Sequence, residues 1–354
     1  MNTPRSFASR RLTRRDAMRL LSITATTGLL MPQPQGRAAE EGPLAKGKLL
    51  VCNKGDQTLS IVDPVTNKQI AAIAEDGITG HEVAASLDGK FAYVPIFGNS
   101  GVGKPGTDGT LIRVIDLQKK AISGTIDFGL GVRPHCPVVC RKKKLLYVTT
   151  ENQKSVAVID PVNLKVLGSV PTGQEQSHML AVSRDGTRGY TANVGPGNVS
   201  VLDLEERKLL KVIPVTPITQ RIALSVDDKF AFTSDQIAPR LAVIDTQKQE
   251  ISKWIDMPGT GYGTAPTPDG NYLVVALMPV NKVALIDLKT WKVTQTVDVP
   301  KAPQEVLVRP DGKMAYVSCD ASKQVAAISL PDFKVAALID VGPVADGLAW
   351  TQEA

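Results

Sequence analysis

The sequence contains only three histidines, His81, His135 and His178, and all three stand at the same position of a repeated segment. Neutral imidazole is a favoured ligand of Zn, Cu, Fe and Mn, and three protein ligands leave a coordination position open for water or substrate. The pattern therefore predicts a site for a divalent transition metal with the open position of a catalytic centre. The alternative interpretation is a polar channel-lining residue that was duplicated with the repeat and kept for solubility or hydrogen bonding.

The same position in the other four repeats is occupied by Gln220, Tyr262, Gln304 and Asp346. Tyr262 is a candidate general acid or base beside the metal, and Asp346 is a candidate to take a proton or to orient a histidine. Gln220 and Gln304 are candidate substrate-binding residues. For Tyr262 and Asp346, a role as plain wall residues of a channel stays open.

Charged residues flank this column of seven positions. Arg133 and Arg221 could hold an anionic substrate through paired N–H groups, and Arg221 is also a candidate catalytic residue. Glu82 and Glu305 directly follow column residues and complete the predicted substrate site. The alternative for Arg221 is an ion pair with Glu82 or Glu305 across the channel.

An internal repeat must bring these residues together. From Lys48 to the C-terminus one segment recurs, and each copy ends a predicted strand in two hydrophobic residues and an acid. Successive triplets are 53, 44, 43, 42, 42 and 42 residues apart. They are Ile61-Val62-Asp63, Val114-Ile115-Asp116, Val158-Ile159-Asp160, Val201-Leu202-Asp203, Val243-Ile244-Asp245, Leu285-Ile286-Asp287 and the degenerate Ala327-Ile328-Ser329.

Each copy alternates β-branched and aromatic residues with polar ones and is divided by turn residues, which is typical of a four-stranded antiparallel meander. In the last copy the predicted strands are 304–308, 314–318, 325–329 and 335–339. We therefore predict an all-β, seven-bladed β-propeller over residues 48–354. The histidine column would begin its innermost strands and line the mouth of the axial channel.

The two ends of the repeat region predict how the ring closes. Residues 48–74 supply only three strands, whereas Asp346 to Trp350 form an additional innermost strand at the other end. Pairing this strand with Leu49 to Asn53 would complete the first blade and remove an exposed sheet edge.

The sequence resembles the YVTN-type β-propeller repeat proteins over residues 45–354. The resemblance is carried by Tyr147-Val148-Thr149-Thr150, Tyr316-Val317-Ser318-Cys319, the Pro-Asp-Gly-Lys turn at residues 310–313 and the Val-Ile-Asp triplets. It implies a fold that is reused by enzymes, electron-transfer proteins and surface-layer binding proteins. The resemblance therefore predicts the architecture and does not select a function.

The first interval is longer than the others because of a glycine-rich segment. Gly98 to Lys104 has the spacing of a phosphate-binding loop, but Pro105 replaces the Ser or Thr that would hold magnesium. A hairpin loop also supplies no helix after it. We predict an extended loop between two strands.

The N-terminus is predicted to be an export leader over residues 1–38, followed by a linker over residues 39–47. An arginine-rich stretch precedes an apolar run from Leu20 to Met31, and Gly36-Arg37-Ala38 offers a cleavage site. The core from Thr13 to Arg19 resembles the twin-arginine signal, with Ala17 and Met18 where that signal prefers Phe and Leu. We expect export to the periplasm by the twin-arginine machinery, with ordinary secretion as the alternative.

The net charge of +6 lies in the leader, because residues 1–38 hold seven Arg and one Asp. The remaining chain has no net formal charge, so we expect no nucleic-acid partner and no stable membrane insertion. Four cysteines occur without a disulfide framework, and we predict Cys52, Cys136, Cys140 and Cys319 to be buried, unpaired side chains.

These features together predict a monomeric, exported, metal-dependent enzyme that acts on a small anionic or oxygenated molecule. A lyase or hydrolase is the first expectation, and a copper oxidoreductase is a variant of it. The identity of the metal among Zn, Cu, Mn and Fe stays open. The alternative is a non-catalytic propeller scaffold that binds a ligand or another protein.

Overall fold

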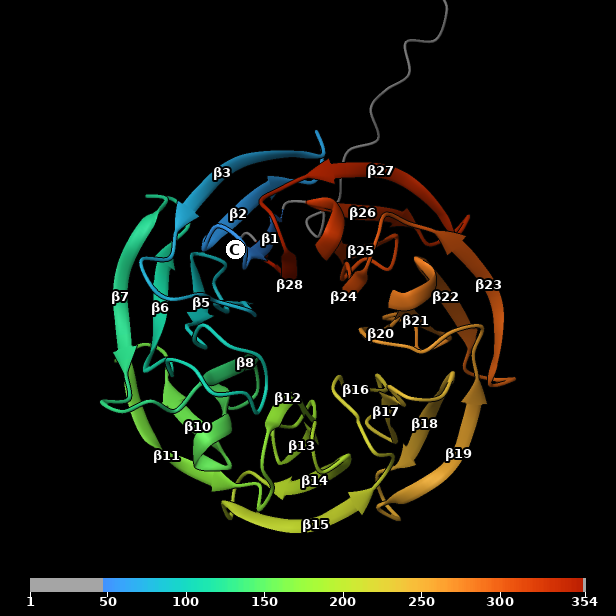
Figure 1. The fold of residues 1–354 in the computed structure, drawn as a ribbon, viewed down its shortest axis with the longest axis horizontal. Helices are drawn as coiled ribbons and strands as arrows, with labels where there is room; N and C mark the ends of the chain where they lie inside the picture. The colour runs from blue at the N-terminus through green and yellow to red at the C-terminus, as the bar shows by residue number, and fades with distance from the viewer. Residues whose placement is uncertain (1–46, 353–354) are drawn as a thin grey trace, which may run out of the picture. The chain divides into compact units, whose positions relative to one another are not determined.

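Seven four-stranded antiparallel sheets form one closed ring in the computed structural model, which describes residues 47–352 (Figure 1). The predicted all-β, seven-bladed propeller is confirmed. The predicted leader, all but the last residue of the predicted linker, and residues 353–354 lie outside the described residues. No helix within residues 47–352 is long and apolar enough to cross a membrane.

The blades are numbered from the first triplet, and their strands are given from the axis outward. Blade one contains β28 (Ala345–Trp350), β1 (Leu49–Asn53), β2 (Thr58–Asp63) and β3 (Lys68–Ala74), and blade two contains β4 (Ala84–Ala85), β5 (Phe91–Pro95), β6 (Leu111–Asp116) and β7 (Ala121–Asp127). Blade three contains β8 (Pro134–Cys140), β9 (Leu145–Thr150), β10 (Ser155–Asp160) and β11 (Lys165–Pro171), and blade four contains β12 (Ser177–Val182), β13 (Arg188–Asn193), β14 (Asn198–Asp203) and β15 (Lys208–Pro214).

Blades five to seven are β16 (Ala223–Leu224), β17 (Phe230–Ser234), β18 (Arg240–Asp245), β19 (Glu250–Asp256); β20 (Thr264–Pro266), β21 (Tyr272–Leu277), β22 (Lys282–Asp287), β23 (Lys292–Asp298); and β24 (Pro303–Val308), β25 (Met314–Cys319), β26 (Gln324–Ser329), β27 (Lys334–Asp340). Three short 3₁₀ helices, η2 (Glu151–Gln153), η3 (Met278–Val280) and η4 (Asp320–Ser322), link the second and third strands of blades three, six and seven.

The ring closes where the sequence predicts. β28 pairs antiparallel with β1, through Leu49 with Trp350 and Val51 with Leu348. The last strand of the chain is thus the innermost strand of the first blade. Pairing the two ends of the repeat region leaves no blade with a missing inner strand.

The acidic residue of each triplet has a local structural role. In all seven blades the pairing between the third and the outer strand shifts register at the triplet, as it does between Ile61 and Val62 in blade one. In six blades the Asp that follows accepts backbone N–H groups of the next turn, as Asp160 does from Val162 and Asn163. The triplet therefore encodes a bulge and a capped turn, and both of these recur with the blade.

The hydrophobic core lies between neighbouring blades. One cluster joins blades one and two through Leu50, Ile61, Val94 and Ile115, and the others lie between successive blades in the same way. The four cysteines are free and buried, as the sequence predicts. An innermost strand packs in this core on both faces, as Leu348 and Ala349 of β28 do in two different clusters.

Candidate functional site

The column residues lie where the innermost strands lose regular pairing. His135, His178, Gln304 and Asp346 fall inside register shifts at the start of their strands. In the other three blades the innermost strand begins two or three residues after the column residue. Bulges re-aim side chains and are over-represented next to active sites. Broken pairing therefore frees this end of each inner strand to present its side chain toward the channel.

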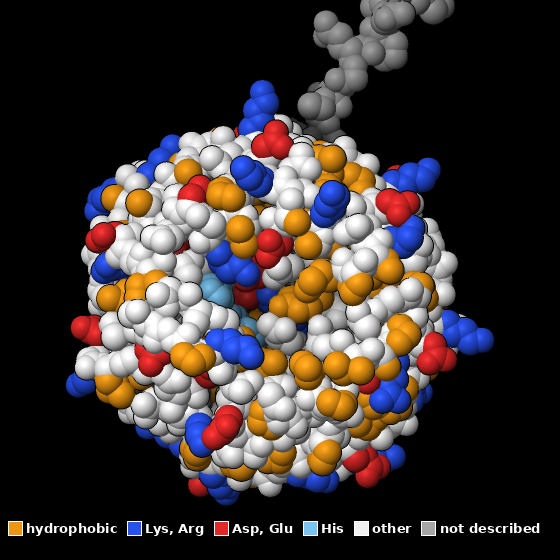
Figure 2. Space-filling view, in the orientation of Figure 1, with side chains coloured by type: hydrophobic (Ala, Val, Ile, Leu, Met, Phe, Trp, Pro, Cys, Tyr) orange, Lys and Arg blue, Asp and Glu red, His pale blue; other side chains and the backbone are white. Residues whose placement is uncertain are grey.

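The three predicted metal ligands gather at one place. The ring centroids of His135 and His178 are 3.6 Å apart and stacked, and those of His81 and His135 are 5.4 Å apart and edge-on. His135 and His178 are buried, with 1% and 3% of their surface exposed, whereas His81 is half-buried. Histidine side chains are visible on the wall of the hollow at the centre of this face (Figure 2).

Burial keeps these imidazoles neutral. It lowers the pKa of His81 to about 4, and the positive charges of Lys54 and Arg221 act in the same direction. Burial likewise holds the pKa values of His135 and His178 well below the ordinary value. Neutral imidazole is the form that binds a metal ion.

The donor chemistry of this cluster suits a transition metal, but the ring orientations do not converge on one point. The Nδ1 atoms of His135 and His178 are buried and have no hydrogen-bond partner. Within residues 47–352, however, no group of three or more His, Cys, Asp or Glu side chains is arranged to hold a metal ion. Stacked rings carry their nitrogen lone pairs side by side, so shared coordination requires side-chain rotation.

Arg221 forms the hub of a charge network across the channel. Its Nη1 lies 2.7 Å from Glu82 and also contacts Glu305, and its Nη2 lies 2.9 Å from Asp346. These carboxylates come from blades two, seven and one, whereas Arg221 precedes the inner strand of blade five. The structure thus shows the cross-channel pairing that the sequence left as an alternative. A catalytic or substrate-binding role for Arg221 stays a prediction.

Carboxylates outnumber cations in this network. Lys54 contacts Asp346 at 2.9 Å and Asp320 at 3.8 Å, so Arg221 and Lys54 together face four carboxylates. Burial raises the pKa values of Glu82 and Glu305, although Arg221 opposes this effect. Burial acts the same way on Asp346, but Lys54 and Arg221 prevail and hold its pKa at about 2. The network therefore contains more carboxyl groups than cations, and it lies beside three neutral histidines.

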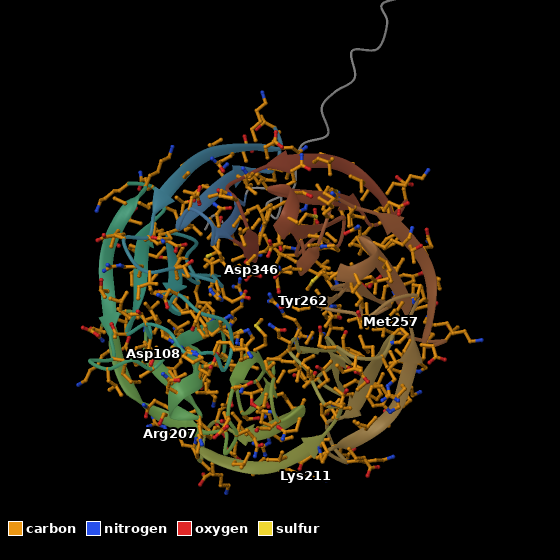
Figure 3. All side chains as sticks on the ribbon, in the orientation of Figure 1. Asp108, Arg207, Lys211, Met257, Tyr262 and Asp346 are labelled. Carbon is orange, nitrogen blue, oxygen red and sulfur yellow. The ribbon has the colours of Figure 1, made fainter. Side chains whose placement is uncertain are left out.

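Three of the other column residues, Asp346, Tyr262 and Gln304, contact members of the charge network. Tyr262 and Asp346 lie near the centre of the ring (Figure 3). The guanidinium carbon of Arg221 lies 5.1 Å from the Tyr262 ring centroid, and burial raises the pKa of the Tyr262 phenol to about 12. Gln304 donates to Asp320, and Gln220 is partly exposed. The structure brings Tyr262, Gln304 and Asp346 to the charge network without testing their predicted roles.

Arg133 contacts the long loop of blade two. It donates to Asp108, to the Ser100 hydroxyl at 2.9 Å and to the Lys104 carbonyl at 2.8 Å, and its Nη1 lies 3.5 Å from Glu151. These contacts hold the loop against blade three. Substrate binding by Arg133 stays a prediction, and its observed contacts are structural.

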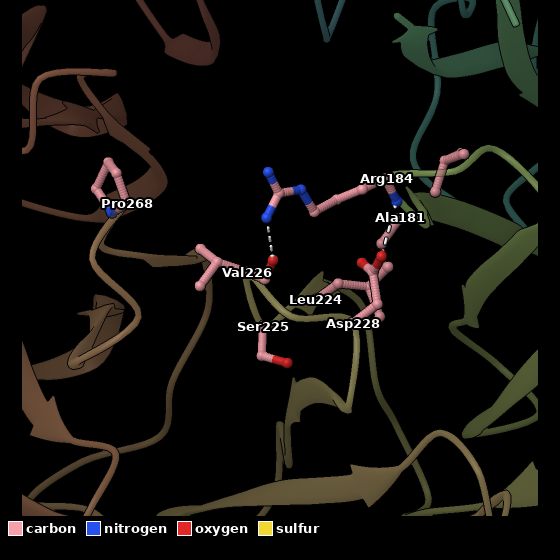
Figure 4. Close-up of a pocket in the computed structure, with 8 residues that line it drawn as sticks. Ala181, Arg184, Leu224, Ser225, Val226, Asp228 and Pro268 are labelled. Atoms are coloured by element: carbon pink, nitrogen blue, oxygen red, sulfur yellow. Dashed lines mark hydrogen bonds between the residues drawn. The ribbon is translucent and has the colours of Figure 1, made fainter. Parts of the chain in front are cut away.

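The opposite end of the inner strands carries a different kind of pocket. It has a volume of about 480 Å³ and is lined by Ala181, Val182, Arg184, Leu224, Ser225, Val226, Asp228 and Pro268. The exposed Arg184 donates to the Val226 carbonyl at 2.7 Å, and its backbone N–H donates to Asp228 at 2.9 Å (Figure 4). The pocket is formed by the ends of β12 and β16 and by the turns beside them, and it contains no column residue.

Sequence reasoning missed three residues of the site. Lys54 and Asp320 lie in the links between second and third strands, and Phe97 is the second residue of the long loop of blade two. Lys54 and Asp320 each directly follow the second strand of their blade. A comparison of this position among the seven repeats could therefore have indicated them. Nothing in the spacing of Phe97 indicates that it contacts the histidines.

No known protein family matches this sequence, and no similar sequence is found among curated proteins. Solved structures with the same fold include hydrazine synthase from Kuenenia stuttgartiensis, with 19% identity and a TM-score of 0.67 over 80% of this chain and 92% of that one. Another is the dihydro-heme d1 dehydrogenase NirN in complex with DHE, with 14% identity and a TM-score of 0.62 over 89% of this chain and 77% of that one. At these identities the similarity shows a shared propeller fold.

Proposed function

We propose that this protein is an exported, metal-dependent enzyme that binds a transition-metal ion through His81, His135 and His178. The observation that carries this proposal is the meeting of three neutral imidazoles from consecutive blades, two of them buried with an unpartnered Nδ1. Unsatisfied buried polar atoms are rare and often mark a functional role or an ion. A bound ion would supply Lewis-acid polarisation of a substrate oxygen or activation of water.

The protein's own residues divide the remaining tasks. Tyr262, whose pKa is raised to about 12, stays protonated at neutral pH and is suited to donate a hydrogen bond or a proton. Asp346 stays ionised, and its charge acts on His81. Gln220 and Gln304 offer amide groups to a bound molecule at the same hollow. These roles fit a lyase or hydrolase better than a purely structural channel.

The charge network favours a neutral oxygenated substrate over an anion. Both arginines of the predicted substrate site already contact carboxylates, and so does Lys54. An anion would have to compete with these buried pairs. The two solved structures of the same fold are named as a synthase and a dehydrogenase, which supports an enzymatic use of the propeller by analogy of fold alone.

Metal binding is tested by titrating the metal-free protein with Zn²⁺, Cu²⁺, Mn²⁺ and Fe²⁺ in a calorimeter, beside elemental analysis of natively exported protein. We expect one ion per chain and a melting temperature that rises with metal and falls with chelator. His135→Ala should abolish both effects, whereas Arg184→Ala, at the opposite end of the channel, should leave them unchanged. Equal melting with and without chelator in the unaltered protein would contradict the proposal.

Export is tested by replacing Arg14 and Arg15 with Lys, which keeps the charge and removes the guanidinium geometry that a receptor reads. We expect periplasmic accumulation to collapse. Undiminished accumulation would indicate the general secretory route instead.

A non-catalytic ligand-binding scaffold is the second candidate. The ion pairs of Arg133 and Arg221 with protein carboxylates favour it, because neither cation lacks a counter-ion that a substrate would have to supply. Two results would support this function. The natively exported protein would contain no metal, and the histidine variants would bind every ligand as the unaltered protein does.

A further inference from the structure

The long loop of blade two forms an arm that the other blades lack. The second and third strands of this blade, β5 and β6, are joined by residues 96–110, whereas short links of a few residues serve the other blades. Backbone bonds continue the hairpin into the arm: Ile96 N–H donates to Leu111, and Gly109 N–H donates to the Phe97 carbonyl at 2.8 Å. Phe97 N–H also donates to the Thr79 carbonyl at 3.0 Å. The start of the arm is therefore fixed by its own backbone.

The arm reaches over blades three and four. Besides its contacts with Arg133, it donates from the Gly103 N–H to Glu151 at 2.9 Å, and both partners belong to blade three. A Cβ added at Gly103 would lie 2.3 Å from the Gln176 amide of blade four, so the backbone packs directly on that side chain. The arm thus starts in the blade of His81 and contacts the blades of His135 and His178.

Phe97 places its ring among all three histidines. It is fully buried, and its centroid lies 4.8 Å from that of His81, 5.2 Å from that of His135 and 6.1 Å from that of His178. No other aromatic side chain of the described residues contacts the three imidazoles in this way. An apolar ring in this position excludes water and fills space that a larger ligand would need.

We propose that Phe97 is the specificity-determining residue of the histidine site: it leaves room for a metal ion and a small molecule and excludes a planar macrocycle such as haem. The inference rests on the proposed function for the identity of the small ligand. Its physical basis is the combination of Phe97 on one side of the imidazoles and the Arg221 network across the channel. Phe97 occupies the space beside the three imidazoles that a flat ring would need in order to stack on them or coordinate them.

The first test measures shielding without any metal. Diethyl pyrocarbonate acylates neutral imidazole nitrogens, and the full chain contains only three histidines, so the absorbance change reports this site alone. We expect Phe97→Ala to react at least about tenfold faster than the unaltered protein, because local access governs the rate. Phe97→Leu, which keeps most of the volume, should stay close to the unaltered protein. Equal rates for Phe97→Ala and the unaltered protein would overturn the proposal.

A second variant protects this test against misfolding. Asp108→Asn weakens the hold of Arg133 on the arm without touching the histidines, and melting curves establish that the variant is folded. It should also speed acylation, by less than Phe97→Ala. An unchanged rate in this variant, together with an unfolded Phe97→Ala, would count against the arm as the shield.

The third test uses hemin as the probe of size. The unaltered full chain should give no shift of the Soret band, whereas Phe97→Ala should gain one that disappears when His135→Ala is added. Hemin binding through His135 in the unaltered protein, or no gain in Phe97→Ala, would contradict the role of Phe97. Failure of Zn²⁺ to bind would instead contradict the proposed function, and the acylation comparison would still decide the role of Phe97.

Discussion

The two ends of the innermost strands differ in how far their side-chain contacts repeat from blade to blade. At the turn end a Ser or Thr two residues before an Asp donates to that Asp, as in Ser86 with Asp88 at 2.6 Å and Ser225 with Asp227 at 2.7 Å. Ser183 with Asp185 and Thr267 with Asp269 repeat the same contact. Four blades therefore stabilise this turn with the same hydrogen bond. At the other end the seven column positions hold four kinds of side chain: three histidines, two glutamines, a tyrosine and an aspartate.

The difference arises from what each end must satisfy. A tight turn is a local problem, and any blade can solve it with the same few residues. The end that carries the column residues has broken strand pairing and faces the other blades across the axis. Its side chains therefore contact residues of distant blades. Repetition is therefore retained where the constraint is local, and variation collects where residues from different blades meet. Function is expected at the variable end.

The largest expected effect removes one inner strand altogether. Deleting residues 345–354 takes away β28, exposing the edge of β1 and part of the apolar cluster that includes Leu348. We expect aggregation or loss of a cooperative unfolding transition, measured by calorimetry and light scattering. Asp346→Asn is the control, because it keeps the strand and removes only one charge. A truncated protein that melts like the intact one would show that β28 does not close the ring.

The next effect compares one arginine from each end. Arg221→Met leaves Glu82, Glu305 and Asp346 without their shared counter-ion, and we expect a loss of about 3–5 kcal/mol in the free energy of unfolding. Arg184→Met, at the exposed turn end, should cost about 0.5 kcal/mol or less. Denaturant unfolding measures both. Similar losses for the two variants would remove the energetic distinction between the ends.

The histidine cluster should make stability depend on pH in a way that the turn end does not. The folded-state pKa values of the histidines lie below the ordinary 6.5, so the unfolded chain binds more protons between the two values. The stability contributed by neutral imidazole is therefore present above pH 6.5 and declines as pH falls through this window.

The comparison of unaltered protein with His178→Gln isolates this contribution from carboxylates such as Glu75, whose pKa is raised to about 7 by burial and whose effect has the opposite sign. The difference in unfolding free energy between the two proteins should change by up to about 1.4 kcal/mol per pH unit below pH 6.5. A difference that stays constant from pH 7 to pH 5 would show that His178 is not held neutral.

The smallest effect tests the turn end itself. Asp227→Ala removes the acceptor of the Ser225 hydroxyl and of the Lys229 backbone N–H, and we expect a loss of about 1 kcal/mol in the free energy of unfolding. Asp185→Ala should cost about the same, because its turn is built alike. Metal binding at the column should be unaffected in both. Unequal losses would show that the repeated turns are not energetically equivalent.

The sequence alone determined the features that repeat. The triplets predicted seven blades, the terminal strand predicted ring closure, and the shared position of His81, His135 and His178 predicted their proximity; the structure has all three. Periodicity carries such information because each blade buries its strands against neighbours of the same architecture. The cysteines were likewise predictable as buried and unpaired.

The tertiary structure decided what these residues contact. Arg221 and Glu82 are 139 positions apart, and no periodicity indicates that they pair across the axis rather than hold a substrate. Phe97 reaches the histidines from an arm that belongs to one blade, outside the repeat. The tilt of the imidazole rings follows from that packing and from the bulges at the strand starts. Such contacts depend on where the ring brings distant chain segments and on how their side chains fill the shared space, which a one-dimensional pattern does not contain.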